Sequence, residues 1–195
     1  FEQKLVTHTY EGIDLQPVYT RGDRPDQRDP HGFPGLPPFV RGPSALGAVL
    51  TGWDLRQEQA HPDLGVANQE ILADLQGGVT SVLLRLDRAA REGWDLDDPA
   101  AADRVSGDGL LAFHVDDLGT ALANVDLKMV GVALEPGAAF LPAAAMLAAL
   151  WQRQEVAPDQ AQGTFGADPL GTLASAGQLP YGSSAAFRWM SDLAQ

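Results

Sequence analysis

Two arginines and a tryptophan in a glycine-rich stretch are the first residues whose types could do chemistry. The stretch FVRGPSALGAVLTGWDLRQ, residues 39–57, contains Arg41, Trp53, Arg56 and Gln57. Guanidinium groups grip phosphate through paired hydrogen bonds, and a tryptophan ring can stack on a base. Arg41, Arg56 and Gln57 are therefore weak candidates for ligand binding. The structural alternative is that Arg41 anchors the loop, Trp53 packs between helix and sheet, and Arg56 and Gln57 begin a helix.

Three carboxylates are a second candidate site, because each follows an expected strand. They are Asp87, Glu135 and Asp168. Ligands of parallel α/β folds bind beyond the carboxyl ends of the strands, where carboxylates can hold a hard cation or act as acid and base. The structural alternative is that they cap or flank the helices that follow. Asp168, directly before Pro169, fits a helix N-cap.

Other common catalytic patterns are missing from the sequence. Without cysteine, the chain has no disulfide, thiolate nucleophile or cysteine-based zinc site. Its four histidines, at 8, 31, 61 and 114, form no HxH or HxxxH pair, which favours surface or hydrogen-bonded structural roles for them. No GxSxG elbow, GxxxxGK[ST] loop or GxGxxG loop follows a strand. Hydrolase, P-loop and dinucleotide-binding functions therefore have no support, and we expect no metal site.

The charge of the chain excludes two classes of partner. The 195 residues carry a net charge of −13, from 26 acidic and 13 basic residues, and no Lys/Arg cluster could neutralise a phosphate backbone. We therefore expect neither nucleic acid nor a membrane surface as partner. No apolar run approaches the ~20 residues of a membrane span, and no signal peptide is visible, so the sequence predicts a cytoplasmic location.

The elements that would position these residues alternate between strands and helices. Buried strands are expected at 79–86 and 128–134, and shorter strands near 48–55 and at 163–166. Helices are expected at 65–76, from 115, at 138–152 and at 183–193. This order predicts an α/β fold with parallel strands joined by right-handed crossovers. Four β/α units are half of an eight-unit TIM-type barrel, so we expect a partial barrel or a small doubly wound sheet.

The beginning of the chain has a different composition. Residues 21–38, RGDRPDQRDPHGFPGLPP, contain five prolines in a polar, glycine-containing segment that cannot form a regular helix. Residues 10–20 contain a short apolar pattern that indicates a small strand or hooked segment. The sequence therefore predicts an extended N-terminal arm over 1–38, followed by the partial barrel domain over 39–195.

The stretch 39–57 resembles the signature of the methylmalonyl-CoA mutase family, which has the form F-T-R-G-P-Y-x-T-M-Y-x-F-R-P-W-T-I-R-Q-Y-A-G. Seven residues match without a gap: Phe39, Arg41, Gly42, Pro43, Trp53, Arg56 and Gln57. REGWDLDDP, at 91–99, resembles the family's R-G-Y-D-S-D-N-P, and GTFGADPLG, from 163, is similar to a segment containing G-T-I-Q-N-D. The resemblance extends over most of the chain.

Positions that bear chemistry in that family are changed here. The tyrosine that directly follows Arg-Gln, which the family places against the acyl group and corrin, is Glu58. The tyrosine of Gly-Pro-Tyr is Ser44, the nearby threonine is Leu46, and the CoA-contacting arginine is Thr51. The resemblance therefore implies that this chain has no catalytic residue of its own.

This combination resembles the small subunit of heterodimeric mutases. The resemblance implies a large catalytic subunit as partner, which binds adenosylcobalamin and isomerises methylmalonyl-CoA to succinyl-CoA through radicals, and a contact role for the N-terminal arm. The cobalamin-ligating D-x-H-x-x-G motif is missing here, so we expect this chain to bind no cofactor. The family's third strand, of the form S-V-S-M-T-M, lines a channel for CoA, and we expect Val130, Val132 and Leu134 to fill that channel instead.

Two alternatives to a non-catalytic subunit stay open at this point. One is an active acyl-CoA mutase relative with altered specificity, in which Glu58 serves as a general acid. The other is an unrelated α/β ligand-binding domain that uses Asp87, Glu135 and Asp168.

Overall fold

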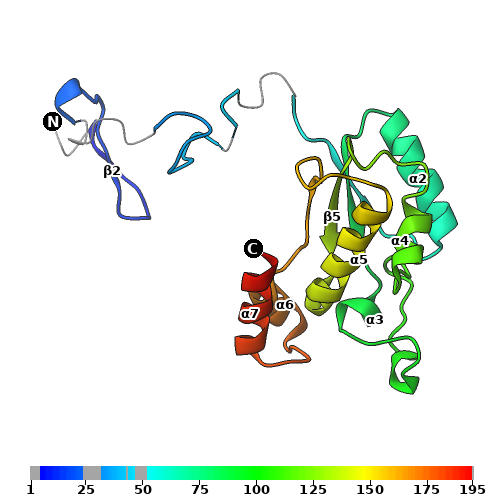
Figure 1. The fold of residues 1–195 in the computed structure, drawn as a ribbon. Coiled ribbons are helices and arrows are strands. Elements are labelled where there is room, and N and C mark those ends of the chain that lie inside the picture. The colour runs from blue at the N-terminus through cyan, green and yellow to red at the C-terminus, as the bar shows by residue number, and fades with distance from the viewer. Residues whose placement is uncertain (1–4, 24–31, 43, 47–51, 195) are drawn as a thin grey trace. The chain divides into compact units, whose positions relative to one another are not determined.

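The computed structural model describes residues 5–23, 32–42, 44–46 and 52–194 of the chain. Its contacts divide the chain into two units, Phe1–Trp53 and Asp54–Gln195 (Figure 1). This division falls later in the chain than the boundary after Pro38, which stays a prediction.

The first unit contains a small antiparallel hairpin. Strand β1 (Thr7–His8) pairs with β2 (Asp14–Leu15), and β2 lies inside the segment where a small strand was expected. A short 3-10 turn, η1 (Arg21–Asp23), opens the segment that was expected to be free of helix. It forms because it precedes the first proline of that segment and because the Asp23 carboxylate accepts the Thr20 N–H at 2.6 Å.

The second unit is built on a parallel sheet of four strands in the order β3-β4-β5-β6. The strands are β3 (Arg56–Gln59), β4 (Ser81–Arg85), β5 (Gly131–Glu135) and β6 (Gly163–Thr164). Helices separate them along the chain, so the expected alternation of strand and helix is confirmed. In the described residues the sheet is open and does not close into a barrel.

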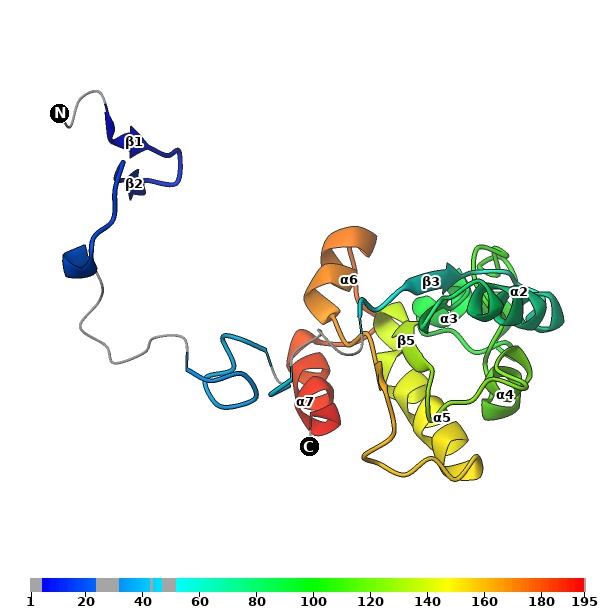
Figure 2. The same ribbon diagram turned by 90° about the horizontal axis from the view of Figure 1, so that it is seen from above.

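Helices α2 (Leu64–Gln76), α4 (Val115–Ala121) and α5 (Phe140–Arg153) pack next to one another along one side of the sheet (Figure 2). The Asp63 carboxylate caps α2 by accepting the backbone N–H groups of Gly65 and Val66 at 2.8 and 2.9 Å. After β6 come α6 (Pro169–Ala176) and α7 (Ser183–Leu193), and the latter has the bounds expected from the sequence. Three short elements complete the unit: α3 (Arg88–Arg91), η2 (Pro99–Ala101) and η3 (Gly137–Ala139).

The first strand of the sheet is not where the sequence indicated it. Residues 48–51 of the expected strand 48–55 lie outside the described residues, residues 52–55 have no regular structure, and β3 begins at Arg56. Arg56 and Gln57 thus lie in a strand rather than a helix, because pairing with β4 outweighs their helix propensity. Trp53, for which packing between helix and sheet was the structural alternative, is 90% exposed.

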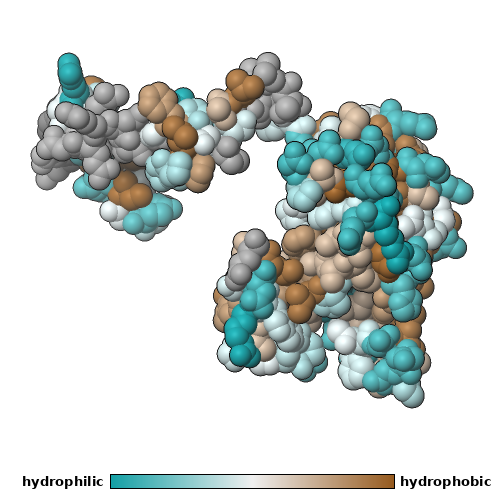
Figure 3. Space-filling model, viewed as in Figure 1, coloured by the Kyte–Doolittle hydropathy of each residue, from teal (hydrophilic) through white to brown (hydrophobic). Residues whose placement is uncertain are grey.

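The hydrophobic core lies between the sheet and its three helices. Val82 and Leu84 of β4 pair in register with Val132 and Leu134 of β5, and all four are buried. The helices contribute buried apolar residues that include Ile71, Leu118 and Leu147. The outer side of α5, by contrast, is mostly small and apolar (Figure 3). Within the described ranges, no helix is long and apolar enough to cross a membrane.

The direction of the β5 side chains corrects one expectation. The Gln59 side chain donates to Asp74 of α2 at 2.7 Å, and Gln59 pairs in register with Leu84, which pairs with Leu134. Val132 and Leu134 therefore face the helices. The expectation that Val130, Val132 and Leu134 fill a channel on the other face is wrong, because shifting a strand by one residue turns every side chain over. Gly131, Ala133 and Glu135 are the residues of β5 on that other face.

Candidate functional site

The face of the sheet opposite the helices carries small and charged side chains. By the alternation of side chains along each strand, this polar face is formed by the following residues. They are Arg56, Glu58, Ser81, Leu83, Arg85, Gly131, Ala133, Glu135 and Thr164. Its charged residues at the carboxyl ends of β3, β4 and β5 lie where parallel α/β proteins bind ligands, so we take this region as the candidate site.

Arg85 lies among three carboxylates at the end of β4. Its guanidinium nitrogens are 3.8 Å from a Glu58 oxygen, 3.7 Å from an Asp108 oxygen and 3.8 Å from a Glu135 oxygen. These distances are too long for direct hydrogen bonds, and the buried Nε of Arg85 has no hydrogen-bond partner within the described part of the chain. Charge attraction therefore holds these residues together. We call Glu58, Arg85, Asp108 and Glu135 the charge cluster.

Asp108 is the best supported carboxylate of the charge cluster. It accepts a hydrogen bond from the Ser106 hydroxyl, and Nη2 of Arg91 approaches it to 2.7 Å. The Ser106 hydrogen bond, followed by the interaction with Arg91, lowers the pKa of Asp108 below its ordinary value of 3.8, although burial opposes the shift. Asp108 therefore keeps its negative charge at neutral pH.

A glycine brings Asp108 to the cluster from a loop. Leu110 donates its N–H to the Arg85 carbonyl at 2.8 Å, and the Asp87 N–H donates to the Leu110 carbonyl at 2.9 Å. An added Cβ at Gly109 would lie 2.3 Å from the Leu86 carbonyl oxygen. The segment that carries Asp108 can therefore lie beside the end of β4 only because residue 109 has no side chain.

Asp87 is a structural residue rather than a reactive one. Its side chain is fully buried and caps α3 by accepting the Ala89 N–H at 2.9 Å. It also accepts the N–H groups of Ser106 and Gly107 at 3.1 and 2.9 Å, and the Ser106 hydroxyl, whose proton goes to the nearer Asp108, lies 3.2 Å away. These donors occupy the carboxylate, so Asp87 fastens the loop to the start of α3.

The three carboxylates expected at the strand ends do not form one site. Asp168 caps α6 by accepting the Gly171 N–H at 2.8 Å, whereas Glu135 belongs to the charge cluster. Both line a cavity of about 620 Å³ that also contains Arg85, but Asp87 is not part of its lining. In the ranges that the structure describes, no three metal-binding side chains gather. A joint metal or acid–base site of Asp87, Glu135 and Asp168 is therefore not formed.

Arg56 is held at the opposite end of the polar face. Its Nη2 donates to Asp54 at 2.9 Å, and its Nε donates to the Ser81 hydroxyl at 2.9 Å. Hydrogen bonding, first from Ser81, lowers the pKa of Asp54 below 3.8. Gln57 is exposed on β3, and Arg41 belongs to the first unit. Ligand binding by Arg41, Arg56 and Gln57 stays a prediction.

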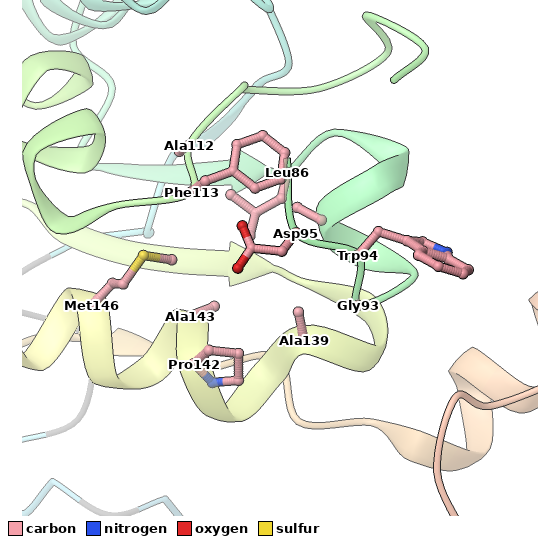
Figure 4. A pocket seen from close by; sticks show the side chains of 11 residues that line it. Leu86, Gly93, Trp94, Asp95, Ala112, Phe113, Ala139, Pro142, Ala143 and Met146 are labelled. Atoms are coloured by element: carbon pink, nitrogen blue, oxygen red, sulfur yellow. The ribbon is translucent and has the colours of Figure 1, made fainter. Parts of the chain in front are cut away.

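A second, smaller cavity lies on the helix side of the sheet. It has a volume of about 190 Å³ and an apolar lining that includes Leu86, Phe113 and Met146. In Figure 4 the Asp95 carboxylate points toward its centre, while the Trp94 ring points away. This cavity is separate from the charge cluster and contains none of its residues.

The described histidines take part in local contacts within their own units. His8 pairs with Asp14 across the hairpin of the first unit. The His61 ring accepts the Asp63 N–H at 3.1 Å, and His114 is the N-cap residue of α4. These positions confirm the structural roles expected for His8 and His61, and His31 lies outside the described residues.

Sequence reasoning gave a signal for only part of the charge cluster. Arg85 is the single charged residue of the apolar stretch 79–86, and Glu58 departs from the family pattern. Glu135 was expected at a strand end, without Arg85 as its partner. Asp108 gave no signal, because nothing in the sequence places its loop beside β4.

The fold and the candidate site define a parallel β/α protein with its polar groups gathered at the carboxyl ends of the strands. The chain belongs to the methylmalonyl-CoA mutase family, whose description, "Methylmalonyl-CoA mutase", matches residues 8–195. This membership confirms the resemblance and overturns the alternative of an unrelated ligand-binding domain.

Relatives of both subunit types are similar to this chain. A methylmalonyl-CoA mutase small subunit of Streptomyces virginiae is 36% identical over 195 residues, covering 100% of this chain and 27% of that protein. A probable large subunit of Mycobacterium bovis is 31% identical over 98% of this chain and 26% of its own length. A small subunit of Propionibacterium freudenreichii is 29% identical over 91% of this chain and 24% of its own length. The chain thus spans about a quarter of the length of these relatives.

Proposed function

We propose that this chain is the N-terminal part of the barrel domain of a non-catalytic small subunit in a heterodimeric mutase. Its partner would be the large subunit, which interconverts methylmalonyl-CoA and succinyl-CoA by an adenosylcobalamin-dependent radical reaction. The four parallel strands with helices on one side are compatible with half of a TIM-type barrel. The similarity to two proteins named as small subunits also supports the proposal.

The observation that carries this proposal is the environment of Glu58. Glu58 occupies the position where the family pattern has a tyrosine, and its side chain lies on the polar face 3.8 Å from Arg85. A glutamate side chain beside arginine offers no aromatic ring to an acyl group. At two further positions, Ser44 replaces the family's tyrosine and has no aromatic ring, and Leu46 replaces a threonine and has no hydroxyl. Thr51 lies outside the described residues.

The cofactor is assigned to the large subunit for reasons found in this chain. The D-x-H-x-x-G motif does not occur in this chain, and the described histidines of the second unit, His61 and His114, lie at the starts of α2 and α4 rather than on the polar face. These residues do not fit adenosylcobalamin, and no step of the reaction is assigned to them.

A contact with the large subunit fits the surface of the N-terminal unit. Several of its large apolar side chains are exposed, including Tyr10, Ile13, Val18, Tyr19 and Phe33. So many exposed apolar groups in one short segment are typical of a binding surface. We infer that residues 1–38 contribute to the subunit contact.

Calorimetry and co-purification test the proposed function. Titrating the purified chain with methylmalonyl-CoA, and separately with adenosylcobalamin, should give no binding heat, whereas the large subunit binds both in the same buffer. Co-expression should recover the chain with the large subunit in equal amounts. Micromolar binding of either ligand by the chain alone would overturn the proposal.

A second candidate function, that of an acyl-CoA mutase with altered specificity, is favoured by the small side chains of the polar face. Ser81, Gly131 and Ala133 are small, as the family's third strand is where it lines a channel for CoA, although all three are buried here. In such a mutase Glu58 would act as a general acid, and Glu58→Gln would abolish the activity of the assembled enzyme. For a non-catalytic subunit, Glu58→Gln and Glu58→Tyr should both leave that activity unchanged.

A further inference from the structure

Side-chain size changes along the polar face. At its amino end β4 and β5 present Ser81 and Gly131, with Arg56 of β3 beside Ser81. One step further β5 presents Ala133, in register with the larger Leu83 of β4. At the carboxyl end of this face the three strands present the long side chains of Glu58, Arg85 and Glu135. The charge cluster is therefore the part of this face where long side chains come from three neighbouring strands.

The charge cluster crosses the sheet from one strand to the next. Glu58 comes from β3, Arg85 from β4 and Glu135 from β5, while Asp108 reaches the same guanidinium from the loop. Neighbouring strands lie about 4.8 Å apart, so the side chains bridge the width of three strands. Because Arg85 is central, it is the residue on which the bridge depends.

The cluster also has an excess of negative charge. Asp108 pairs with Arg91 as well as Arg85, so two arginines face three carboxylates. The lowered pKa of Asp108 keeps its carboxylate ionised. An anionic ligand that approached the strand ends would therefore meet both a row of paired side chains and a net repulsive charge.

We propose that the charge cluster is a barrier that closes the polar face at the carboxyl ends of the strands, and that ion pairing rather than hydrophobic filling holds it shut. This inference rests on the proposed function, because the barrier would exclude the acyl-CoA that the family's catalytic subunits take up. Arg85 is its central residue, and Ala133 lies behind it on β5.

A cysteine at position 133 makes the barrier measurable. The chain has no cysteine, and Ala133 is 1% exposed, so Ala133→Cys places one shielded thiol on the polar face. The probe is N-ethylmaleimide, and the readout is its rate of reaction by mass spectrometry. We expect the Arg85→Ala/Glu135→Ala pair to raise that rate about tenfold or more, since the shielding side chains are removed.

Two further variants separate ion pairing from bulk and from general loosening. Glu58→Gln/Glu135→Gln keeps side-chain size but removes two of the three charge pairs of Arg85 and leaves the pair with Asp108, and it should also raise the rate severalfold. Arg153→Ala/Asp116→Ala removes an exposed ion pair between α5 and α4, with side chains 56% and 83% exposed, and should leave the rate unchanged. Circular dichroism checks that each variant is folded.

The outcomes decide the proposal in either direction. An unchanged rate in the folded glutamine pair would show that bulk, not charge, shields residue 133 and would overturn the proposal. If the alanine pair does not fold, the glutamine pair alone decides. N-ethylmaleimide is not a CoA ester, so an unchanged rate would overturn the barrier but leave the proposed function to be decided by calorimetry. Conversely, binding of methylmalonyl-CoA in calorimetry would overturn the proposed function without itself showing that the barrier is absent.

Discussion

The two faces of the sheet are built from the same strands but follow different physical rules. On the helix face, buried apolar residues such as Leu84 and Val132 are held by exclusion of water, which needs close packing but no particular partner. On the polar face, Arg85 and its carboxylates are partly exposed and lie at ion-pair distances. We therefore expect the helix face to supply most of the stability of the fold, whereas residues of the polar face can be substituted at a smaller cost in stability.

Truncating neighbouring leucines on β4 gives the sharpest test of this difference. Leu84 is fully buried against the helices, so Leu84→Ala should lower the free energy of unfolding by about 2–5 kcal/mol. Leu83 is half-buried on the polar face, and Leu83→Ala should cost about 1 kcal/mol. Urea unfolding measures both variants. Equal or reversed costs would show that the two faces of β4 have been exchanged.

A glycine substitution tests the loop that supplies Asp108 to the polar face. The Cβ of Gly109→Ala would collide with the Leu86 carbonyl, and we expect a loss of about 1–3 kcal/mol in thermal or urea unfolding. The matched control is Gly119→Ala in α4, where the new Cβ would be 3.7 Å from a Leu150 methyl carbon. That change should be neutral or stabilising by about 0.5–1 kcal/mol, because alanine favours a helix. If both variants behave alike, the loop does not depend on close approach at residue 109.

The smallest expected effect concerns charge on the polar face. Because the folded pKa of Asp108 is lowered, its carboxylate stabilises the fold above its ordinary value of 3.8, and this contribution is lost as the pH falls through the folded pKa. Asp108→Asn should therefore lower the unfolding midpoint at neutral pH but match the native chain in strong acid. Asp116→Asn, at a far more exposed pair, should change little at neutral pH. A penalty for Asp108→Asn that persists in strong acid would contradict an electrostatic origin.

The sequence predicted the elements that have a strong apolar period. It did not predict an element whose structure depends on pairing with a neighbouring strand. Helix α2 and strand β4 follow from their apolar patterns, because burial on one or both faces leaves that record. Strand β3, with the residues RQEQ, has no such record, and only its hydrogen bonds to β4 make it a strand.

The candidate site was predictable residue by residue but not as an arrangement. Glu58 and Glu135 could be selected, yet the face to which Glu135 belongs depends on the register of β5, which was misplaced by one residue. Asp108 reaches the cluster through a loop contact that no local pattern encodes. Distances between residues far apart in sequence are a property of the fold, so the grouping had to come from the structure.

The Asp87 carboxylate holds together the two ends of the segment that runs from α3 to Gly107. One buried carboxylate holds both the start of α3 and the returning backbone at Ser106 and Gly107, so the two ends of the segment are fastened at a single point. Leu96, midway along it, is 52% exposed and is the natural place for a protease to cut. A single cut there should leave two fragments that migrate as one folded molecule and separate only in denaturant.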